Sequence, residues 1–184
     1  MNALVQTQGK SLAVFNAAQA GAEQRQYLTF MLGGEMFSIG ILCIKEIIEY
    51  AGLTEVPMMP ACIRGVINLR GAVVPVMDLS SRFGKPTTAV TKRTCIVIVE
   101  VNNDDQASQV MGIVVDAVNA VLEIPASEIE PPPTFGARIR TDFIEGMGKV
   151  NGKFVILLNV NRVLSVDEIG AMAQMGEAAP LLLA

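Results

Sequence analysis

The stretch of sequence that decides the fold is RGVINLRGAVVPVMDL, which runs from Arg64 to Leu79. It holds two apolar runs, at residues 65–69 and 72–79, and the pair Arg70-Gly71 lies between them. Runs of this length that are rich in valine and bounded by glycine predict two β-strands joined by a tight turn. Pro75 has no backbone N–H, so the second strand is predicted to lie at a sheet edge or beside a bulge.

Arg70 is expected to project from this turn. One interpretation is a tight β-corner in which the arginine is merely solvated. The other is a binding role, because a planar guanidinium can hold a carboxylate through two N–H groups at once. The residues of the stretch leave both interpretations open.

Outward from this stretch, short strand-like runs follow one another along the chain. Gly33-Gly34 and Asn151-Gly152 are two-residue turn signals of β-hairpins. Residues 58–63 are predicted to form one helical turn, and residues 160–175 have helical spacing. Closely spaced strands with turn signals favour a barrel or a sandwich. The predicted strands are residues 27–32, 36–41, 44–50, 65–69, 72–79, 94–101, 109–116, 119–124, 144–150 and 153–159.

The chain is predicted to consist of an arm, a domain and a tail. Residues 1–24 are rich in Ala and Gln and are predicted to be a flexible arm, and residues 171–184 form the tail. Between them lies a domain at residues 25–170. The charged, threonine-rich segment near residues 80–93 is predicted to link two barrel halves with about five strands each, although no sequence repeat between the halves is evident.

The composition excludes several function classes. The sequence has no histidine and a formal net charge of −4. Histidine is the usual general base and the commonest metal ligand, so we expect no metal and no imidazole catalysis. The acidic balance argues against nucleic-acid binding. No glycine-rich phosphate loop occurs, and no cofactor is expected. A small hydrolase that uses two carboxylates remains the enzymatic alternative.

Neither a membrane span nor a secretory signal is predicted. Every apolar run is much shorter than the roughly 20 residues that a spanning helix needs, and the N-terminal region has only a short apolar core. We therefore expect a cytoplasmic protein. The cysteines Cys43, Cys62 and Cys95 are far apart and odd in number, which argues against a disulfide framework. They are predicted to be buried, unreactive thiols.

Several motifs, taken in order, resemble the CheW family of chemotaxis adaptors, which link chemoreceptors to the CheA histidine kinase. The first is RGVINLRGAVVPVMDL itself, followed by Arg82. Upstream, Phe30 and residues 37–39 and 44–47 resemble the first strands of the family. Downstream, residues 112–118, 121–122 and 144–148 resemble its second half. The resemblance covers about residues 26–170.

This resemblance implies a fold of two five-stranded SH3-like β-barrels packed together, with a C-terminal helix, and no enzymatic activity. It implies one face for the CheW-like regulatory domain of CheA and another for the cytoplasmic hairpin tip of a methyl-accepting chemoreceptor. The protein would then be recruited to receptor arrays at the inner membrane. The residues that match the receptor-contacting region are Ile44, Glu46, Gly65 and Arg70. Val66 and Ile67 are expected to add apolar contact to the receptor there, and Gly71 and Ala72 are proposed to face the kinase.

Several alternatives stay open at this level. The three apolar residues among the receptor-contacting set are equally consistent with simple core packing, and Glu46 and Arg70 are hypothesised to pair with each other. Arg64 is assigned no specific role, and Arg82 is interpreted as a solvated or structural charge. CheV and CheA also contain CheW-like parts, but a free-standing adaptor is preferred. A scaffold of a non-flagellar chemosensory system is the nearest alternative.

Overall fold

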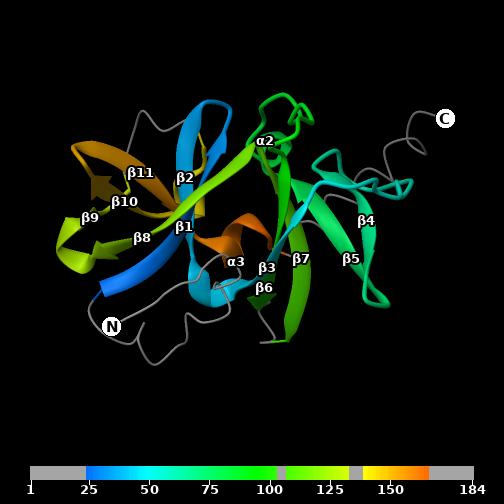
Figure 1. Cartoon of the computed structure of the whole chain (residues 1–184), viewed down its shortest axis with the longest axis horizontal. Helices are drawn as coiled ribbons and strands as arrows, with labels where there is room; N and C mark the ends of the chain where they lie inside the picture. Colours follow the sequence, from blue (N-terminus) through cyan, green and yellow to red (C-terminus); the bar gives the residue numbers. More distant parts are fainter. Residues whose placement is uncertain (1–23, 103–106, 133–138, 166–184) are drawn as a thin grey trace, which may run out of the picture.

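The computed structural model describes residues 24–102, 107–132 and 139–165, and strands dominate these ranges (Figure 1). The all-β prediction is therefore confirmed. Two one-turn helices lie within the described ranges, α2 (Leu79–Arg82) and α3 (Val160–Val163). The strands are β1 (Gln24–Leu32), β2 (Glu35–Gly40), β3 (Ile44–Glu49), β4 (Ile63–Leu69), β5 (Ala72–Asp78), β6 (Cys95–Asn102), β7 (Ser108–Val115), β8 (Ala117–Pro125), β9 (Ile129–Glu130), β10 (Ile144–Val150) and β11 (Lys153–Leu158).

The strands form two sheets that lie side by side in Figure 1. The first sheet has six strands in the order β8-β1-β2-β11-β10-β9, and the second has five in the order β3-β6-β7-β5-β4. Each sheet contains one parallel pair, β2 with β11 and β5 with β7, and its other pairs are antiparallel. This arrangement is consistent with two SH3-like barrels.

The two halves of the chain exchange strands between the sheets. The first half places the β1–β2 hairpin in the first sheet and β3, β4 and β5 in the second. The second half does the reverse, with β6 and β7 in the second sheet and β8, β10 and β11 in the first. Residues 80–93 were expected to link two barrel halves, but they join β5 to β6, which belong to the same sheet. The order of strands in a sheet cannot be predicted from their order along the chain, because strand pairing depends on contacts between segments that are distant in the sequence.

Because the two halves exchange equivalent strands, the β4–β5 hairpin of the first half corresponds residue by residue to the β10–β11 hairpin of the second half. Each begins with an isoleucine, a register shift and a glycine: Ile63 to Gly65 in β4 and Ile144 to Gly146 in β10. Each turns through two residues with positive φ, Arg70-Gly71 at 51° and 90° and Asn151-Gly152 at 52° and 79°. Two-residue turns of this kind fit the right-handed twist of hairpin strands. The sequence repeat is hidden because few residues besides these are shared.

Three apolar clusters hold the fold together. The largest lies between the sheets and contains Phe30 and Phe37 from the first sheet with Val97 and Ile113 from the second. A smaller cluster belongs to the first sheet and another to the second, the latter formed by Val76, Ile96, Ile98 and Val114. Strand β6 serves two clusters, because successive side chains of a strand point to opposite faces. Two packed barrels are expected to have one apolar core inside each barrel and a third between them, and the three clusters match this expectation.

One local prediction differs from the structure, and one of the two alternatives for Pro75 is excluded. Residues 58–63 form turns and the start of β4, not a helical turn. Pro60 explains this, since a proline disfavours helical geometry at the residue before it. Strand β5 lies between β7 and β4 and is not an edge strand. The bulge interpretation of Pro75 holds instead, because Gly65, at the register shift of β4, pairs with the adjacent Val76.

The termini are only partly described. The predicted helix at 160–175 begins as α3 and its last described residue is 165, so the rest of that prediction lies outside the described residues. The predicted arm, apart from Gln24 in β1, and the predicted tail lie outside them as well. No helix in the described ranges is long and apolar enough to cross a membrane.

Candidate functional site

The turn between β4 and β5 places an arginine where the backbone disfavours it. Arg70 has a φ of 51°, and a left-handed conformation costs an ordinary residue about 1–2 kcal/mol. At the matching position of the other hairpin stands Asn151, a residue type that tolerates this conformation well. A residue held in a costly conformation is a reason to look for a functional role.

The guanidinium of Arg70 forms an ion pair with the carboxylate of Glu46 on β3. Nη2 of Arg70 contacts Oε2 of Glu46, and Nη1 donates to Oε1 at 3.5 Å. This contact raises the pKa of Arg70, which therefore stays charged. The Arg70 side chain is 72% exposed and that of Glu46 is 29% exposed. An ion pair as exposed as this one contributes little to stability, because water and salt screen it, so folding alone does not explain it.

The ion pair joins the two edge strands of the second sheet. Strands β3 and β4 stand at opposite ends of its strand order, yet Glu46 and Arg70 meet, so the sheet curls on itself. A backbone bridge between Thr54 and Val66 makes a second closure, with N–O distances of 3.0 and 2.8 Å. Barrel closure thus brings together the sequence-predicted residues of β3 and β4.

The apolar members of the predicted set are partly buried. Ile44 packs against the cluster between the sheets, and Ile67 packs against the cluster of the second sheet. Val66 is half-buried at the Thr54 bridge. Ile44 and Ile67 therefore belong in part to a core, which was the alternative interpretation, and all three residues keep a part open to solvent.

Gly65 is buried and has a φ of 153°. A Cβ atom there would lie 2.5 Å from the carbonyl oxygen of Thr54. The glycine is thus needed for the close approach of the two backbones, and any effect of Gly65 on binding acts through that geometry.

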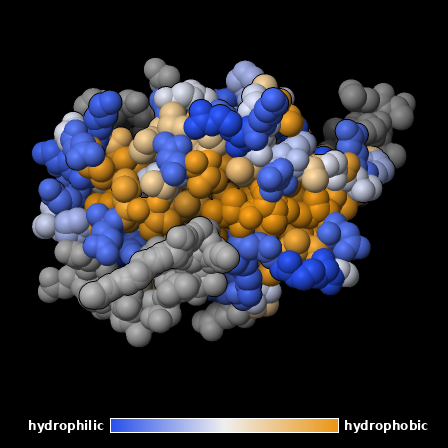
Figure 2. All heavy atoms as spheres, in the orientation of Figure 1, coloured by the Kyte–Doolittle hydropathy of each residue, from blue (hydrophilic) through white to orange (hydrophobic). Residues whose placement is uncertain are grey.

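The two residues predicted to face the kinase lie at the exposed tip of the same hairpin. Gly71 and Ala72 are both exposed, and the N–H of Gly71 donates to Oδ1 of Asn68 at 2.9 Å. The next residue, Val73, is 71% exposed, although it carries a large apolar side chain. In Figure 2 hydrophobic residues form a band across the middle of the visible face, reaching toward β4 and β5. Apolar area left in water is typical of a protein-binding surface.

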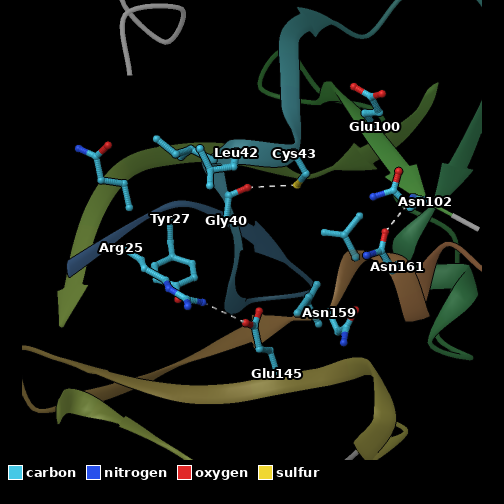
Figure 3. Close-up of a pocket in the computed structure, with 14 residues that line it drawn as sticks. Arg25, Tyr27, Gly40, Leu42, Cys43, Glu100, Asn102, Glu145, Asn159 and Asn161 are labelled. Carbon is cyan, nitrogen blue, oxygen red and sulfur yellow. Dashed lines mark hydrogen bonds and ion pairs between the residues drawn. The ribbon is translucent and has the colours of Figure 1, made fainter. Parts of the chain in front are cut away.

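A cavity of about 790 Å³ lies beside the 3-10 turn Ile41–Cys43 that precedes β3, and Leu42 of this turn is 66% exposed (Figure 3). Its charged side chains are already paired. Arg25 and Glu145 approach to 3.9 Å, and Glu100 meets Lys45 at 3.2 Å. A hydrogen bond from Ser108 and the contact with Lys45 lower the pKa of Glu100. Each of the two carboxylates that line the cavity, Glu100 and Glu145, therefore has a cationic partner.

The described part of the chain shows no candidate metal site. No group of three or more His, Cys, Asp or Glu side chains gathers in those residues. The three cysteines are free thiols, Cys62 buried and the other two half-buried.

The thiol of Cys43 borders the cavity, where it donates to the carbonyl oxygen of Gly40 at 3.1 Å (Figure 3). Burial raises its pKa from 9.0 to about 11. At pH 8 the thiolate fraction of Cys43 is then about a hundredfold lower than in the unfolded chain. The more basic thiolate is also more nucleophilic, which recovers about a factor of ten.

We therefore expect iodoacetamide to alkylate Cys43 about tenfold more slowly in the folded protein than in urea. Peptide mass spectrometry over a time course measures the rate, with Cys95 as the internal comparison. Equal rates in the folded and unfolded chain would contradict this account of the thiol.

Sequence reasoning missed the interior role of two charged residues. Asp78 is fully buried and forms an ion pair with Arg64 at 2.8 Å. A local signal existed for Asp78, because an aspartate followed by Ser80 and Ser81 is typical of a helix N-cap, and it accepts hydrogen bonds from both backbone N–H groups.

Arg82 has a structural role, one of the two interpretations that the sequence left. Its Nε donates to the carbonyl oxygen of Val163 at 2.8 Å, and its guanidinium lies 4.7 Å from the centre of the Phe143 ring. It thereby ties α2 to α3 across the boundary between the sheets.

The chain is similar to known proteins over most of its length. The family model described as CheW-like domain matches residues 26–168. Chemotaxis protein CheW of Klebsiella aerogenes is 33% identical over 145 residues, which cover 79% of this chain and 84% of that protein. Chemotaxis protein CheW of Bacillus subtilis is 34% identical, over 76% of this chain and 86% of that protein. Protein FrzA of Myxococcus xanthus is 29% identical, over 86% of this chain and 96% of that protein.

A solved structure matches the fold as well. The crystal structure of the scaffolding protein TtCheW from Thermoanaerobacter tengcongensis superposes with a TM-score of 0.70 at 34% identity. The match covers 79% of this chain and 91% of that one.

Proposed function

This chain belongs to the CheW-like domain family, and from that membership we propose that it is a non-enzymatic adaptor that couples methyl-accepting chemoreceptors to the CheA histidine kinase. The names of its relatives, chemotaxis protein CheW and scaffolding protein, support this role. Binding to both partners would hold the protein in receptor arrays at the inner membrane.

The observation that carries the proposal is the ion pair between Glu46 and Arg70. The matching positions of the other half are Ala120 on β8, by strand register, and Asn151 in the β10–β11 turn. These residues are uncharged, so this fold closes its first sheet without such a pair. The charges of the second sheet are thus additional to what folding requires, and Arg70 occupies a costly conformation besides. Recognition of a partner is the role that accounts for both facts.

The receptor face in this proposal consists of Ile44, Glu46, Gly65, Val66, Ile67 and Arg70. A receptor tip is a helical hairpin, and an amphipathic helix binds an apolar groove through side chains on one of its faces. The exposed parts of Ile44, Val66 and Ile67 supply apolar contact. Arg70 is 72% exposed, so its free N–H groups can also reach a carboxylate or a carbonyl oxygen of the receptor.

The kinase face in this proposal is the hairpin tip at Gly71 and Ala72, with Val73 added from its exposure. The partner is the CheW-like regulatory domain of CheA. An exposed valine flanked by a tight turn provides an apolar contact with little side-chain entropy to lose. The two faces are adjacent on one hairpin, which places receptor and kinase side by side.

Two related roles share this surface. A scaffold of a non-flagellar chemosensory system would use the same receptor and kinase faces with different partners. Mass spectrometry of the receptors that co-purify with the protein from its own cells separates the two roles.

Replacing Arg70 with asparagine is expected to weaken binding of a receptor hairpin fragment about tenfold or more, the usual cost of removing a central arginine from an interface. The fold should be unharmed, because asparagine relieves the left-handed strain, and the free energy of unfolding should stay equal or rise slightly. Isothermal titration with the fragment and urea denaturation measure the two quantities. Binding of the CheA regulatory domain, through Gly71 and Ala72, is expected to persist.

The matched control is Asn151→Arg in the other hairpin, which should lower stability by about 1 kcal/mol and leave both affinities unchanged. Reversing the charges of Glu46 and Arg70 singly and then together adds a second test. Recovery in the double reversal indicates that the pair itself shapes the surface. Full receptor affinity in Arg70→Asn would contradict the proposed receptor face.

A further inference from the structure

Asp78 lies outside the proposed docking surface, yet it is the most fully bonded charge in the described ranges. Its carboxylate has no exposed area. Oδ1 accepts from the Ser80 N–H and the Thr88 hydroxyl, both at 3.0 Å. Oδ2 accepts from the Thr88 N–H at 2.9 Å and from Nη1 of Arg64 at 2.8 Å. A buried carboxylate with this many donors is rigidly held, because each lost bond leaves a polar group unpaired.

Arg64 extends this network to the end of β3. Its Nη2 donates to the hydroxyl of Tyr50 at 3.0 Å, and its guanidinium lies 5.6 Å from the centre of the Tyr50 ring. Nη1 also donates to the carbonyl oxygen of Thr88 at 3.2 Å. Tyr50 directly follows β3, and Asp78 is the last residue of β5. One side chain on β4 therefore contacts the ends of β3 and β5 at the same time.

A bulge in β4 sets the direction of Arg64. Ile63 pairs with Met77 and Gly65 with Val76, so Arg64 is the extra residue between them. A bulge re-aims the side chain of the extra residue away from the regular alternation of the strand. The matching residue of the other half, in the bulge of β10, is Glu145.

The other half closes its sheet without this network. By strand register and spacing, Glu145 corresponds to Arg64, Ile124 to Tyr50 and Asn159 to Asp78. None of these three residues is a cation, and the position of the buried carboxylate is taken by an amide. The network therefore belongs to the second sheet alone, the same sheet that carries the Glu46–Arg70 pair.

We propose that Arg64, held by Asp78, is the positioning residue of the receptor face: it fixes β3 against β4 so that Glu46 and Arg70 stay in register, without touching the receptor itself. This inference rests on the proposed function. The receptor face is assembled from two edge strands that share no continuous ladder, so its shape depends on the few contacts between them. Its polar contacts are the Arg64 network and the ion pair at the turn, and the Thr54–Val66 bridge ties the segment that follows β3 to β4.

The test compares the full-length wild type with Arg64→Met, which keeps length without charge, and Arg64→Lys, which keeps charge without the planar fork. Thr54 and Val66 are the two N–H donors of the bridge. The exchange rate of their amide hydrogens therefore measures how firmly β4 is held to the segment that follows β3. Affinities for a receptor hairpin fragment and for the CheA regulatory domain report on docking.

For Arg64→Met we expect exchange at Thr54 and Val66 to be about tenfold faster or more, as local opening becomes easier, and to be accelerated more there than in the β6–β7 ladder, whose amides report only the global cost of leaving Asp78 without its cation. Receptor affinity should fall about tenfold and kinase affinity should hold. Arg64→Lys should lie between wild type and Arg64→Met in both readouts, because its ammonium can still pair with Asp78.

Three results would overturn the inference. The first is an unchanged exchange rate at Thr54 and Val66 in Arg64→Met. The second is an equally faster exchange at every amide, which would indicate a merely structural role for Arg64. The third is faster exchange at Thr54 and Val66 alone while the receptor affinity stays unchanged. If the wild type failed to bind the receptor fragment at all, the proposed function would fail instead. The exchange data would then still report whether Arg64 clamps the two strands.

Discussion

Replacing Gly65 with alanine is expected to lower the free energy of unfolding by about 2–4 kcal/mol, from overpacking and backbone strain together. The added Cβ would lie 2.5 Å from the carbonyl oxygen of Thr54 and 3.0 Å from its carbonyl carbon. These are backbone atoms, so no side chain can rotate away, and the Thr54–Val66 bridge must open. Urea denaturation followed by circular dichroism measures the change.

Substitutions at two other glycines distinguish the two causes of the lower stability of Gly65→Ala, overpacking and backbone strain. Gly71 has a φ of 90° with open space around its Cβ position, so Gly71→Ala tests backbone strain alone and should cost about 1 kcal/mol. Gly40 has neither a positive φ nor a close neighbour, so Gly40→Ala should change stability by less than about 0.5 kcal/mol. If Gly65→Ala were no worse than Gly71→Ala, the close approach to Thr54 would not be limiting.

The opening of the bridge has a consequence for binding. Gly65 is buried and is expected to shape the receptor face through the backbone, so Gly65→Ala should weaken receptor binding only as far as it displaces Val66 and the turn that follows. A binding loss in Gly65→Ala together with a normal affinity for CheA would match a role in shaping the surface.

Replacing Asp78 with alanine is expected to cost about 3–5 kcal/mol, the usual penalty for breaking a buried ion pair from one side. The substitution leaves the N–H and hydroxyl of Thr88, and the N–H of Ser80, without their acceptor. It also leaves the guanidinium of Arg64 in a site where only 21% of that side chain is exposed. Thermal and urea unfolding both measure the loss.

Removing Arg64 as well should recover part of that cost. In the double variant Arg64→Met with Asp78→Ala no orphan cation remains, so the two single costs should exceed the double cost by about 1–3 kcal/mol. Asn159→Ala, at the matching cap of α3, is the control and should cost only about 1 kcal/mol, as for an ordinary helix cap. Strict additivity of the two single costs would show that Arg64 and Asp78 stabilise the fold independently.

The contrast between the two hairpins is the main lesson about the site. They share their bulges and left-handed turns, but only β4–β5 carries Arg64, Arg70 and Asp78. Where the same backbone is built twice, residues that the fold itself demands are expected in both copies. Residues found in one copy alone are candidates for recognition.

Sequence patterns predicted the local structure well. Alternating apolar residues and the pairs Gly33-Gly34 and Asn151-Gly152 located the β1–β2 and β10–β11 hairpins, because strand period and turn geometry are set by neighbouring residues. The hypothesis that Glu46 and Arg70 pair is also met by the structure. That prediction came from the family resemblance, since 24 positions separate the two residues and no local rule connects them.

The helical turn predicted at residues 58–63 was wrong, whereas of the two alternatives for β5, an edge position or a bulge, only the bulge holds. In the first case Pro60 opposes helical geometry at the residue before it. In the second, the place of β5 depends on its pairing with β7, and a strand's neighbours are selected by the packing of the whole sheet.

The sequence by itself determined the strands, their turns, the absence of histidine chemistry and, through its motifs, the family. Only the tertiary structure decided that the two halves exchange strands, that Arg64 and Asp78 form a buried network, and that β3 meets β4 at Glu46 and Arg70. The physical reason is the range of the interactions. Turn and strand preferences act between near neighbours, whereas barrel closure and burial of charge depend on contacts between residues that only the folded chain brings together.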